Sequence, residues 1–236
     1  MNTELLLQTF ERDGYLLLDD FFDAELMQAL NARILAHFGD DPAFLHSDEF
    51  LEKAKTDVIP WFPQDAGRSE FDLVDNNVDL QQLTGALLGA SWQSLSCMVM
   101  FSKKASLGQA WHQDCAPEHP AHYNLNRLVY SSDIDDETGG QTVVVPGSHR
   151  RGLLPAGDPW ANLAGQQILR PRKGTLILLH GHIWHRVLPV KGHYRYSTNY
   201  RAVPAGTATN ITDVCVYRNM RYQFSTTTVV EDRTAH

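Results

Sequence analysis

The hydrophobic periodicity of this 236-residue chain changes near residue 91, and this change limits the folds that it can adopt. Before that point, apolar residues recur at helical spacing, which predicts two helices capped by Thr3 and Asp23 and further helices beginning near Ser47 and Asp79. Beyond it, short apolar segments separated by glycine- and proline-containing turns predict strands. The predicted strands are Ser94–Lys103, Asn126–Asp133, Gln141–Val145, Gln166–Leu169, Thr175–Leu179, Ile183–Val187, Arg195–Val203 and Asp213–Tyr217.

Strands that follow a helical portion favour a mainly β fold in which an antiparallel barrel or double-sheet jelly roll is supported by N-terminal helices. A further strand is expected at Tyr15–Phe22, and an irregular connection at Ile59–Pro63. Chains of this length commonly form one such domain. We therefore expect a single domain over 1–236, with a helical portion at about 1–90, a β core at about 91–218 and a polar, loosely held C-terminal tail.

The composition argues against several classes of protein. A formal net charge of −8 gives no general attraction to nucleic acid or to an anionic membrane. No apolar run approaches the roughly 20 residues that span a bilayer. The three cysteines are widely spaced and form no CxxC pair, which argues against a disulfide framework or a zinc knuckle. A cytoplasmic protein with a small-molecule partner is therefore expected, and its oligomeric state is left open.

Eleven histidines are unusually many for this length, and they gather between His112 and His193. A His-x-Asp pair is a weak signal alone, because chance gives about one in such a chain, and this chain has two. His46-Ser47-Asp48 lies where Ser47 or Asp48 caps a helix, so we interpret it as structural. His112 and Asp114 lie in the β portion, where residues two apart share one face of a strand.

An imidazole and a carboxylate on one face, joined by a distant imidazole, form the facial triad of non-haem Fe(II) oxygenases. The candidates for that second imidazole are His180, His182, His185 and His193. His185 opens a predicted strand, and Arg195 follows ten residues later on the next one. The forked guanidinium of an arginine binds a carboxylate through two parallel hydrogen bonds, so Arg195 could hold a keto acid beside the metal.

The ordered combination of these motifs resembles the phytanoyl-CoA dioxygenase family from about residue 8 to residue 203. The matching segments are Phe10–Tyr15, Asp19–Phe22, Trp111–Asp114, Asp133–Gly140, Val144–His149, Gly174–Leu176 and His185–Arg195. The resemblance implies a double-stranded β-helix of the jelly-roll or cupin-like type. It also implies an oxygenase that uses Fe(II), 2-oxoglutarate and O2.

Carried onto this sequence, the resemblance makes His112, Asp114 and His185 the iron ligands, and it makes Arg195 the anchor of the distal carboxylate of 2-oxoglutarate. Lys103 matches a lysine that some members place near this cosubstrate. The family often carries a serine two residues after its last ligand, where this chain has Val187. The hydroxyls of Thr175 or Thr198 are the candidates to replace that serine, unless Arg195 acts alone.

The resemblance implies decarboxylation of 2-oxoglutarate to succinate and CO2, coupled to oxidation of a substrate C–H bond. Related halogenases replace the carboxylate ligand with a small residue, so Asp114 favours hydroxylation, desaturation or ring closure. The alternative class is a non-oxidative jelly-roll metalloprotein, either a cupin-like isomerase or a ligand-binding protein, which would have no use for Arg195. We expect the substrate to be a natural-product intermediate or small metabolite rather than a long acyl-CoA.

Overall fold

The computed structural model describes residues 2–223 and 228–232. Five α-helices lie in the first 90 residues: α1 (Thr3–Asp13), α2 (Ala24–Phe38), α3 (Asp48–Ala54), α4 (Asp72–Asp75) and α5 (Val78–Leu88). The caps of four helices follow from the sequence, because a side-chain oxygen before the first turn accepts a backbone N–H. Those caps are Asn2, Asp23, Ser47 and Asn77.

Thirteen strands form two antiparallel sheets within the described residues. The six-stranded sheet has the order β1 (Tyr15–Leu18), β8 (Leu176–His180), β5 (Leu125–Val129), β10 (Tyr194–Val203), β3 (Gln93–Lys103) and β2 (Ile59–Trp61). The seven-stranded sheet has the order β13 (Thr228–Asp232), β12 (Met220–Gln223), β11 (Val214–Tyr217), β4 (Gln109–Gln113), β9 (His185–Val187), β6 (Thr142–Val144) and β7 (Gln167–Ile168). The prediction of a jelly-roll core with N-terminal helices is confirmed.

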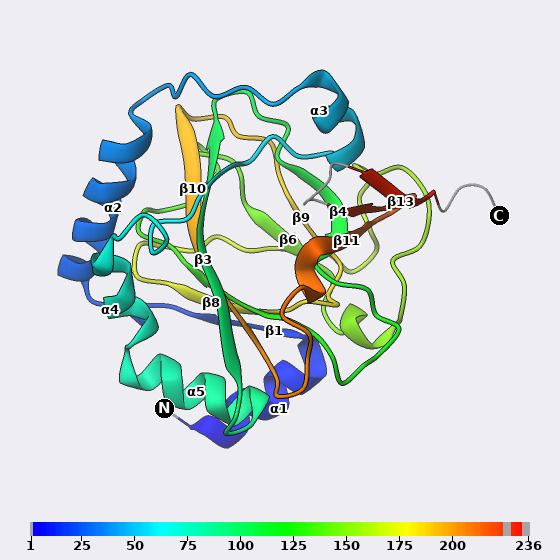
Figure 1. Ribbon diagram of the computed structural model, residues 1–236, viewed down its shortest axis with the longest axis horizontal. Coiled ribbons are helices and arrows are strands. Elements are labelled where there is room, and N and C mark those ends of the chain that lie inside the picture. Colours follow the sequence, from blue (N-terminus) through cyan, green and yellow to red (C-terminus); the bar gives the residue numbers. More distant parts are fainter. Residues whose placement is uncertain (1, 224–227, 233–236) are drawn as a thin grey trace.

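Helices α1, α2, α4 and α5 cover the outer face of the six-stranded sheet (Figure 1). The main core lies between these two layers, where Leu30 and Ile34 of α2 pack into one cluster with Leu178 of β8. On β10, Tyr196 and Tyr200 join this core, while Arg195 and Asn199 line the cavity on the other face of the sheet. The alternation of side chains along β10 therefore separates the hydrophobic core from a polar interior.

Three local expectations were wrong or incomplete. α1 is capped by Asn2 rather than Thr3. The expected irregular connection contains β2, which pairs with β3, and Pro60 is tolerated because β2 is an edge strand. Part of the expected loose tail forms β13, whose backbone pairs with β12; residues 225–227 and 233–236 of that tail lie outside the described residues.

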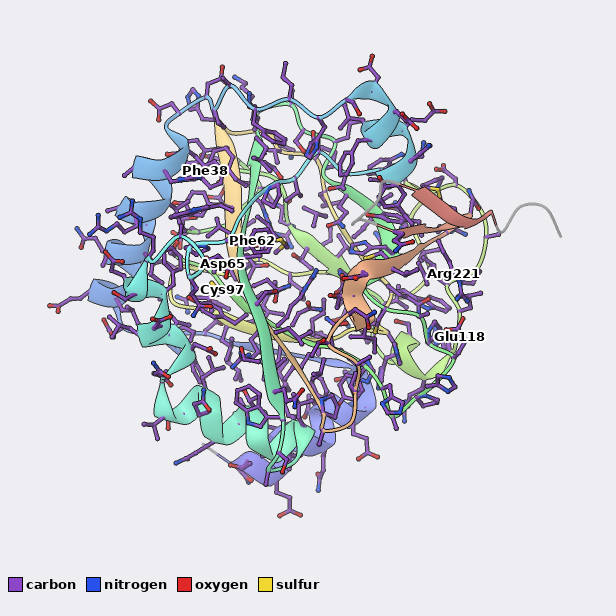
Figure 2. The ribbon with its side chains drawn as sticks, viewed as in Figure 1. Phe38, Phe62, Asp65, Cys97, Glu118 and Arg221 are labelled. Carbon is purple, nitrogen blue, oxygen red and sulfur yellow. The ribbon has the colours of Figure 1, made fainter. Side chains whose placement is uncertain are left out.

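The C-terminal strands are also tied to the loop between β4 and β5. Arg221 of β12 and Glu118 of this loop lie beside each other at the edge of the molecule and form an ion pair (Figure 2). None of the helices in the described part of the chain is long and apolar enough to cross a membrane.

The packing of the helical layer can be tested at Leu178, which is fully buried in the main core. Leu178→Ala should lower the free energy of unfolding by about 2–5 kcal/mol, because it removes buried methyl groups and leaves a cavity. Denaturant titration monitored by circular dichroism measures this change. Leu73→Ala is the control, since Leu73 is 62% exposed and its loss should cost far less. Equal effects for the two variants would contradict the proposed layer packing.

Candidate active site

The register of the seven-stranded sheet brings three potential metal ligands together. His112 of β4 lies directly opposite His185 of β9, and Asp114 follows the end of β4. One donor atom from each of the three side chains lies within 4.8 Å of the others, and all three side chains are buried. Within the residues that the structure describes, this is the only such group of histidines, cysteines and acids.

Both imidazoles are oriented by the backbone. Nδ1 of His112 lies 2.8 Å from the carbonyl oxygen of Ala110, and Nδ1 of His185 lies 3.0 Å from that of Ile183. A carbonyl can only accept, so each Nδ1 carries a proton, and Nε2 is the nitrogen of each ring that is left to bind a metal at the centre of the group. The ring of Tyr217, opposite His112 on β11, stacks on the His112 ring at 5.4 Å.

The carboxylate of Asp114 is held by a chain of amides from the other sheet. Asn126 of β5 donates to Asp114 Oδ2 at 2.5 Å, and its own Oδ1 accepts from Asn199 of β10 at 2.8 Å and from Asn124 at 3.0 Å. A single orientation of the Asn126 amide satisfies all three bonds. The Asp114 carboxylate is therefore fixed in both position and rotation.

The charge states of this group suit a divalent cation. Burial, together with the neighbouring His185, lowers the pKa of His112 to about 3, so this ring is neutral at physiological pH. Burial would raise the pKa of Asp114, but His185, Arg201 and the Asn126 amide outweigh it and hold this pKa below its usual value. Two imidazoles and one carboxylate are the donors of the facial triad and leave coordination positions open, so the residues present fit an Fe(II) ion.

The three side chains open into a cavity of about 620 Å³ between the two sheets. Arg195 of β10 lines this cavity as well and is 3% exposed. Its Nε donates to the carbonyl of Gly140 at 3.0 Å and its Nη1 to Ser197 Oγ at 2.9 Å. Gly140 has no side chain to block this contact: a Cβ there would lie 2.7 Å from Arg195 Cγ.

The other three residues expected near 2-oxoglutarate do not reach this cavity. The Lys103 ammonium lies 3.0 Å from Asp41 Oδ1. The Thr175 hydroxyl donates to Asp19 Oδ1 at 2.9 Å, in the turn before β8. Thr198 is buried on β10 three positions after Arg195, so strand alternation puts it on the opposite face, with the core tyrosines.

Sequence reasoning missed several residues of the cavity wall. Asn126 and Asn199 gave no local signal, because their roles depend on pairing between distant strands. Thr142 of β6 lines the cavity directly opposite Val187, and only the β6–β9 register reveals this relation. His46 lines the cavity although Ser47 caps α3 as expected; its ring stacks on Phe50 at 4.1 Å, so the purely structural interpretation of His46 was incomplete.

A protein-family model for phytanoyl-CoA dioxygenase (PhyH) matches residues 10–193. The chain belongs to the phytanoyl-CoA dioxygenase family. The predicted family is thereby confirmed, and the His112–Asp114–His185 group agrees with the metal site expected of an iron- and 2-oxoglutarate-dependent dioxygenase. The family match includes all three of these residues and ends two positions before Arg195.

A curated relative, the ectoine dioxygenase of Bordetella bronchiseptica, is 28% identical over 167 residues, which are 64% of this chain and 51% of the relative. The chain therefore spans about half the length of that relative. Solved structures of two other proteins share the fold of this chain.

The epimerase SnoN in complex with Fe3+, alpha ketoglutarate and nogalamycin RO has a TM-score of 0.68 and 22% identity, covering 89% of this chain and 87% of that one. HygX from Streptomyces hygroscopicus with nickel and 2-oxoglutarate bound has a TM-score of 0.67 and 15% identity, covering 87% and 88% respectively. At these identities the likeness establishes the jelly-roll fold and leaves the reaction of this family member to be argued from its own site.

The amide chain behind Asp114 predicts a measurable effect on metal binding. Asn126→Ala removes the donor to Asp114 Oδ2 and should weaken Fe(II) or Ni(II) binding by about 10- to 100-fold, as other losses of ligand-orienting partners do. Anaerobic titration calorimetry measures the dissociation constant. Asn210→Ala is the matched control, because Asn210 is exposed and its side chain makes no capping bond. Unchanged affinity in a folded Asn126→Ala variant would contradict this role.

Proposed function

We propose that this chain is an Fe(II)- and 2-oxoglutarate-dependent oxygenase that hydroxylates a C–H bond of a small organic substrate. The observation that carries the proposal is that His112, Asp114, His185 and Arg195, from both sheets, line one cavity. In the reaction, one atom of O2 enters the C–H bond, the other enters the succinate formed from 2-oxoglutarate, and CO2 leaves. Desaturation and ring closure are variants of this oxidation in which the substrate loses two hydrogen atoms and water is released. Epimerisation, the reaction for which SnoN is named, leaves the oxidation state of the substrate unchanged and would need an external reductant.

His112, Asp114 and His185 would hold the iron, which supplies the activation of O2 when bound. The residues around them keep these ligands in the required state. The carbonyls of Ala110 and Ile183 hold protons on the Nδ1 atoms and so turn the Nε2 atoms toward the metal, and Asn126 holds the Asp114 carboxylate in one rotation. The burial of all three ligands excludes bulk water from the reacting centre.

Arg195 would anchor the distal carboxylate of 2-oxoglutarate, with Thr142 as the hydroxyl that replaces the missing serine at Val187. Thr142 and Val187 are cross-strand partners on β6 and β9, and both line the cavity. The hydroxyls of Thr142 and Tyr130 lie 3.2 Å apart, and Nη2 of Arg195 lies 3.5 Å from the Tyr130 hydroxyl. We leave Lys103, Thr175 and Thr198 out of the proposed site. Asp41 and Asp19 hold the first two outside the cavity, and strand alternation puts Thr198 on the opposite face of β10.

A small substrate agrees better with the charges than an acyl-CoA does. Three loop arginines, whose positive charges a phosphate could otherwise contact, have partners elsewhere: Arg170 pairs with Asp136, Arg172 pairs with Asp20, and Arg150 donates to the carbonyl of Arg12. The three cysteines are buried free thiols, which supports the proposed location in a reducing cytoplasm.

The oxygenase proposal predicts that purified protein with Fe(II), ascorbate and air converts 2-oxoglutarate to succinate. Asp114→Ala should abolish this activity by removing the carboxylate ligand. Succinate is quantified by mass spectrometry, and 18O2 should label one succinate oxygen. Iron binding by the wild-type protein with no succinate above the Asp114→Ala background, in the presence of a substrate library, would favour the non-oxidative metalloprotein.

The cosubstrate anchor gives a separate prediction. Arg195→Ala should raise the KM for 2-oxoglutarate by at least about 10-fold, because a buried charged hydrogen bond is worth about 1.5–3 kcal/mol. Thr142→Val, which removes one neutral hydroxyl, should raise it less. Steady-state succinate formation gives both values, and Lys103→Ala serves as the comparison outside the cavity. If Lys103→Ala raised the KM as much as Arg195→Ala, the assigned anchor would be wrong.

A further inference from the structure

Arg201 is a second arginine on the cavity-facing side of β10, six residues after Arg195. Its side chain is 18% exposed, and its Nε is buried without a hydrogen-bond partner in the part of the chain that the structure describes. Its Nη2 lies 3.9 Å from Asp114 Oδ1, which is beyond hydrogen-bond distance. A guanidinium in this position carries a charge and donors that the protein itself does not fully satisfy.

Arg201 differs from the buried arginines of the fold in the number of hydrogen bonds that its guanidinium makes. Arg127, Arg186, Arg195 and Arg218 each donate at least two hydrogen bonds to backbone carbonyls or polar side chains, although Arg127 Nη1 and Arg186 Nε also have no partner in the described residues. Those bonds hold each of the four guanidinium groups in the wall of the fold. Partial burial of a charge without such bonds is costly, so an arginine that faces a cavity in this state indicates a ligand group that completes it.

Asp114 cannot supply the hydrogen bonds that the Arg201 guanidinium lacks. Its carboxylate already accepts the Asn126 amide and faces both imidazoles of the proposed metal site. With Fe(II) and dianionic 2-oxoglutarate bound, the charges of these two groups would cancel. The Asp114 carboxylate and the guanidinium groups of Arg195 and Arg201 would then sum to one positive charge beside the metal site. Asp213 also lines the cavity but is exposed, so water and salt screen its charge.

We infer that the substrate is a compact organic acid whose single carboxylate binds Arg201, an inference that rests on the proposed oxygenase function. The planar fork of a guanidinium matches a carboxylate, and the position of Arg201 next to Asp114 places this acid group close to the metal ligands. The body of the substrate packs against the apolar wall formed by Met98, Met100 and Leu128. Phe50 and Phe62, the latter labelled in Figure 2, line the same cavity from the helical portion.

The test compares acids with their neutral amides on the loaded protein. Wild type, Arg201→Gln and Arg201→Lys are saturated anaerobically with Fe(II) and 2-oxoglutarate. They are then titrated with benzoate, cyclohexanecarboxylate and N-acetylglycine, and with the amide of each acid. The visible absorption band of the iron–2-oxoglutarate chelate reports cosubstrate binding, and calorimetry reports the affinity for each probe. Arg170→Gln is the control, because Arg170 is an exposed arginine paired with Asp136.

At least one acid should bind wild type about 10- to 100-fold more tightly than its amide, as expected for a charged hydrogen-bonded pair. Arg201→Gln should abolish this preference for the acid and should change the affinity for 2-oxoglutarate by no more than a few-fold. Arg201→Lys should keep part of the preference for the acid, and Arg170→Gln should keep all of it. An absent preference in wild type, or an unchanged one in Arg201→Gln, overturns the inference. A loss confined to 2-oxoglutarate affinity also overturns it and assigns Arg201 to the cosubstrate.

These outcomes are separable from failure of the oxygenase proposal itself. If wild-type protein forms no chelate band with Fe(II) and 2-oxoglutarate, the proposed function fails and the inference fails with it. If the band forms normally and only the acid preference is missing, the oxygenase proposal stands and the assignment of Arg201 alone is wrong. Aerobic succinate formation stimulated by a preferred acid, and lost in Arg201→Gln, would extend the result from binding to turnover.

Discussion

The buried carboxylate of Asp114 is the constraint on which the arrangement of the two sheets depends. A desolvated carboxylate is costly unless donors and positive charges surround it. Asp114 follows β4 in the seven-stranded sheet, yet its hydrogen-bond partner Asn126 belongs to β5 in the six-stranded sheet, and Asn199 of β10 supports that amide. The polar chain therefore crosses the interior and fixes the sheets relative to each other at the point where the metal ligands meet.

Buried side chains on the two faces of the six-stranded sheet have different roles. Toward the helices, Tyr196 and Tyr200 of β10 pack into a dense core, which makes the strand rigid. Toward the interior, the intervening residues Arg195, Asn199 and Arg201 line the cavity. A rigid strand with its outer face locked by packing is a precise support for charged groups, because each guanidinium is positioned by the strand rather than by a mobile loop.

The sequence was informative wherever function depends on local spacing. His112 and Asp114 could be assigned because residues two apart share a strand face, and a strand-borne Arg195 could be expected from the chemistry of keto acids. The same alternation rule, applied from Arg195, would have excluded Thr198 at once, since an odd separation reverses the face. Thr175 and Lys103 have no such local test, because acidic partners far away in sequence, Asp19 and Asp41, hold them.

Thr142 shows why other residues of the cavity could be identified only from the structure. Nothing near Thr142 in sequence marks it, and it becomes a candidate for the missing hydroxyl only because the β6–β9 register puts it opposite Val187. A hydroxyl on the cross-strand neighbour lies on the same face of the sheet, with its Cβ about 4.5–5.5 Å from the Cβ of the opposed residue, so both side chains can reach the same bound group. A departure from a family motif can therefore preserve its chemistry, and the comparison that matters is between positions in space rather than between positions in the chain.

The same reasoning applies to the cavity wall, where His46 and Phe50 from the helical portion face residues of the β core. The helical portion thus contributes to the cavity without contributing a ligand, so its sequence can change with the substrate while the metal site stays constant.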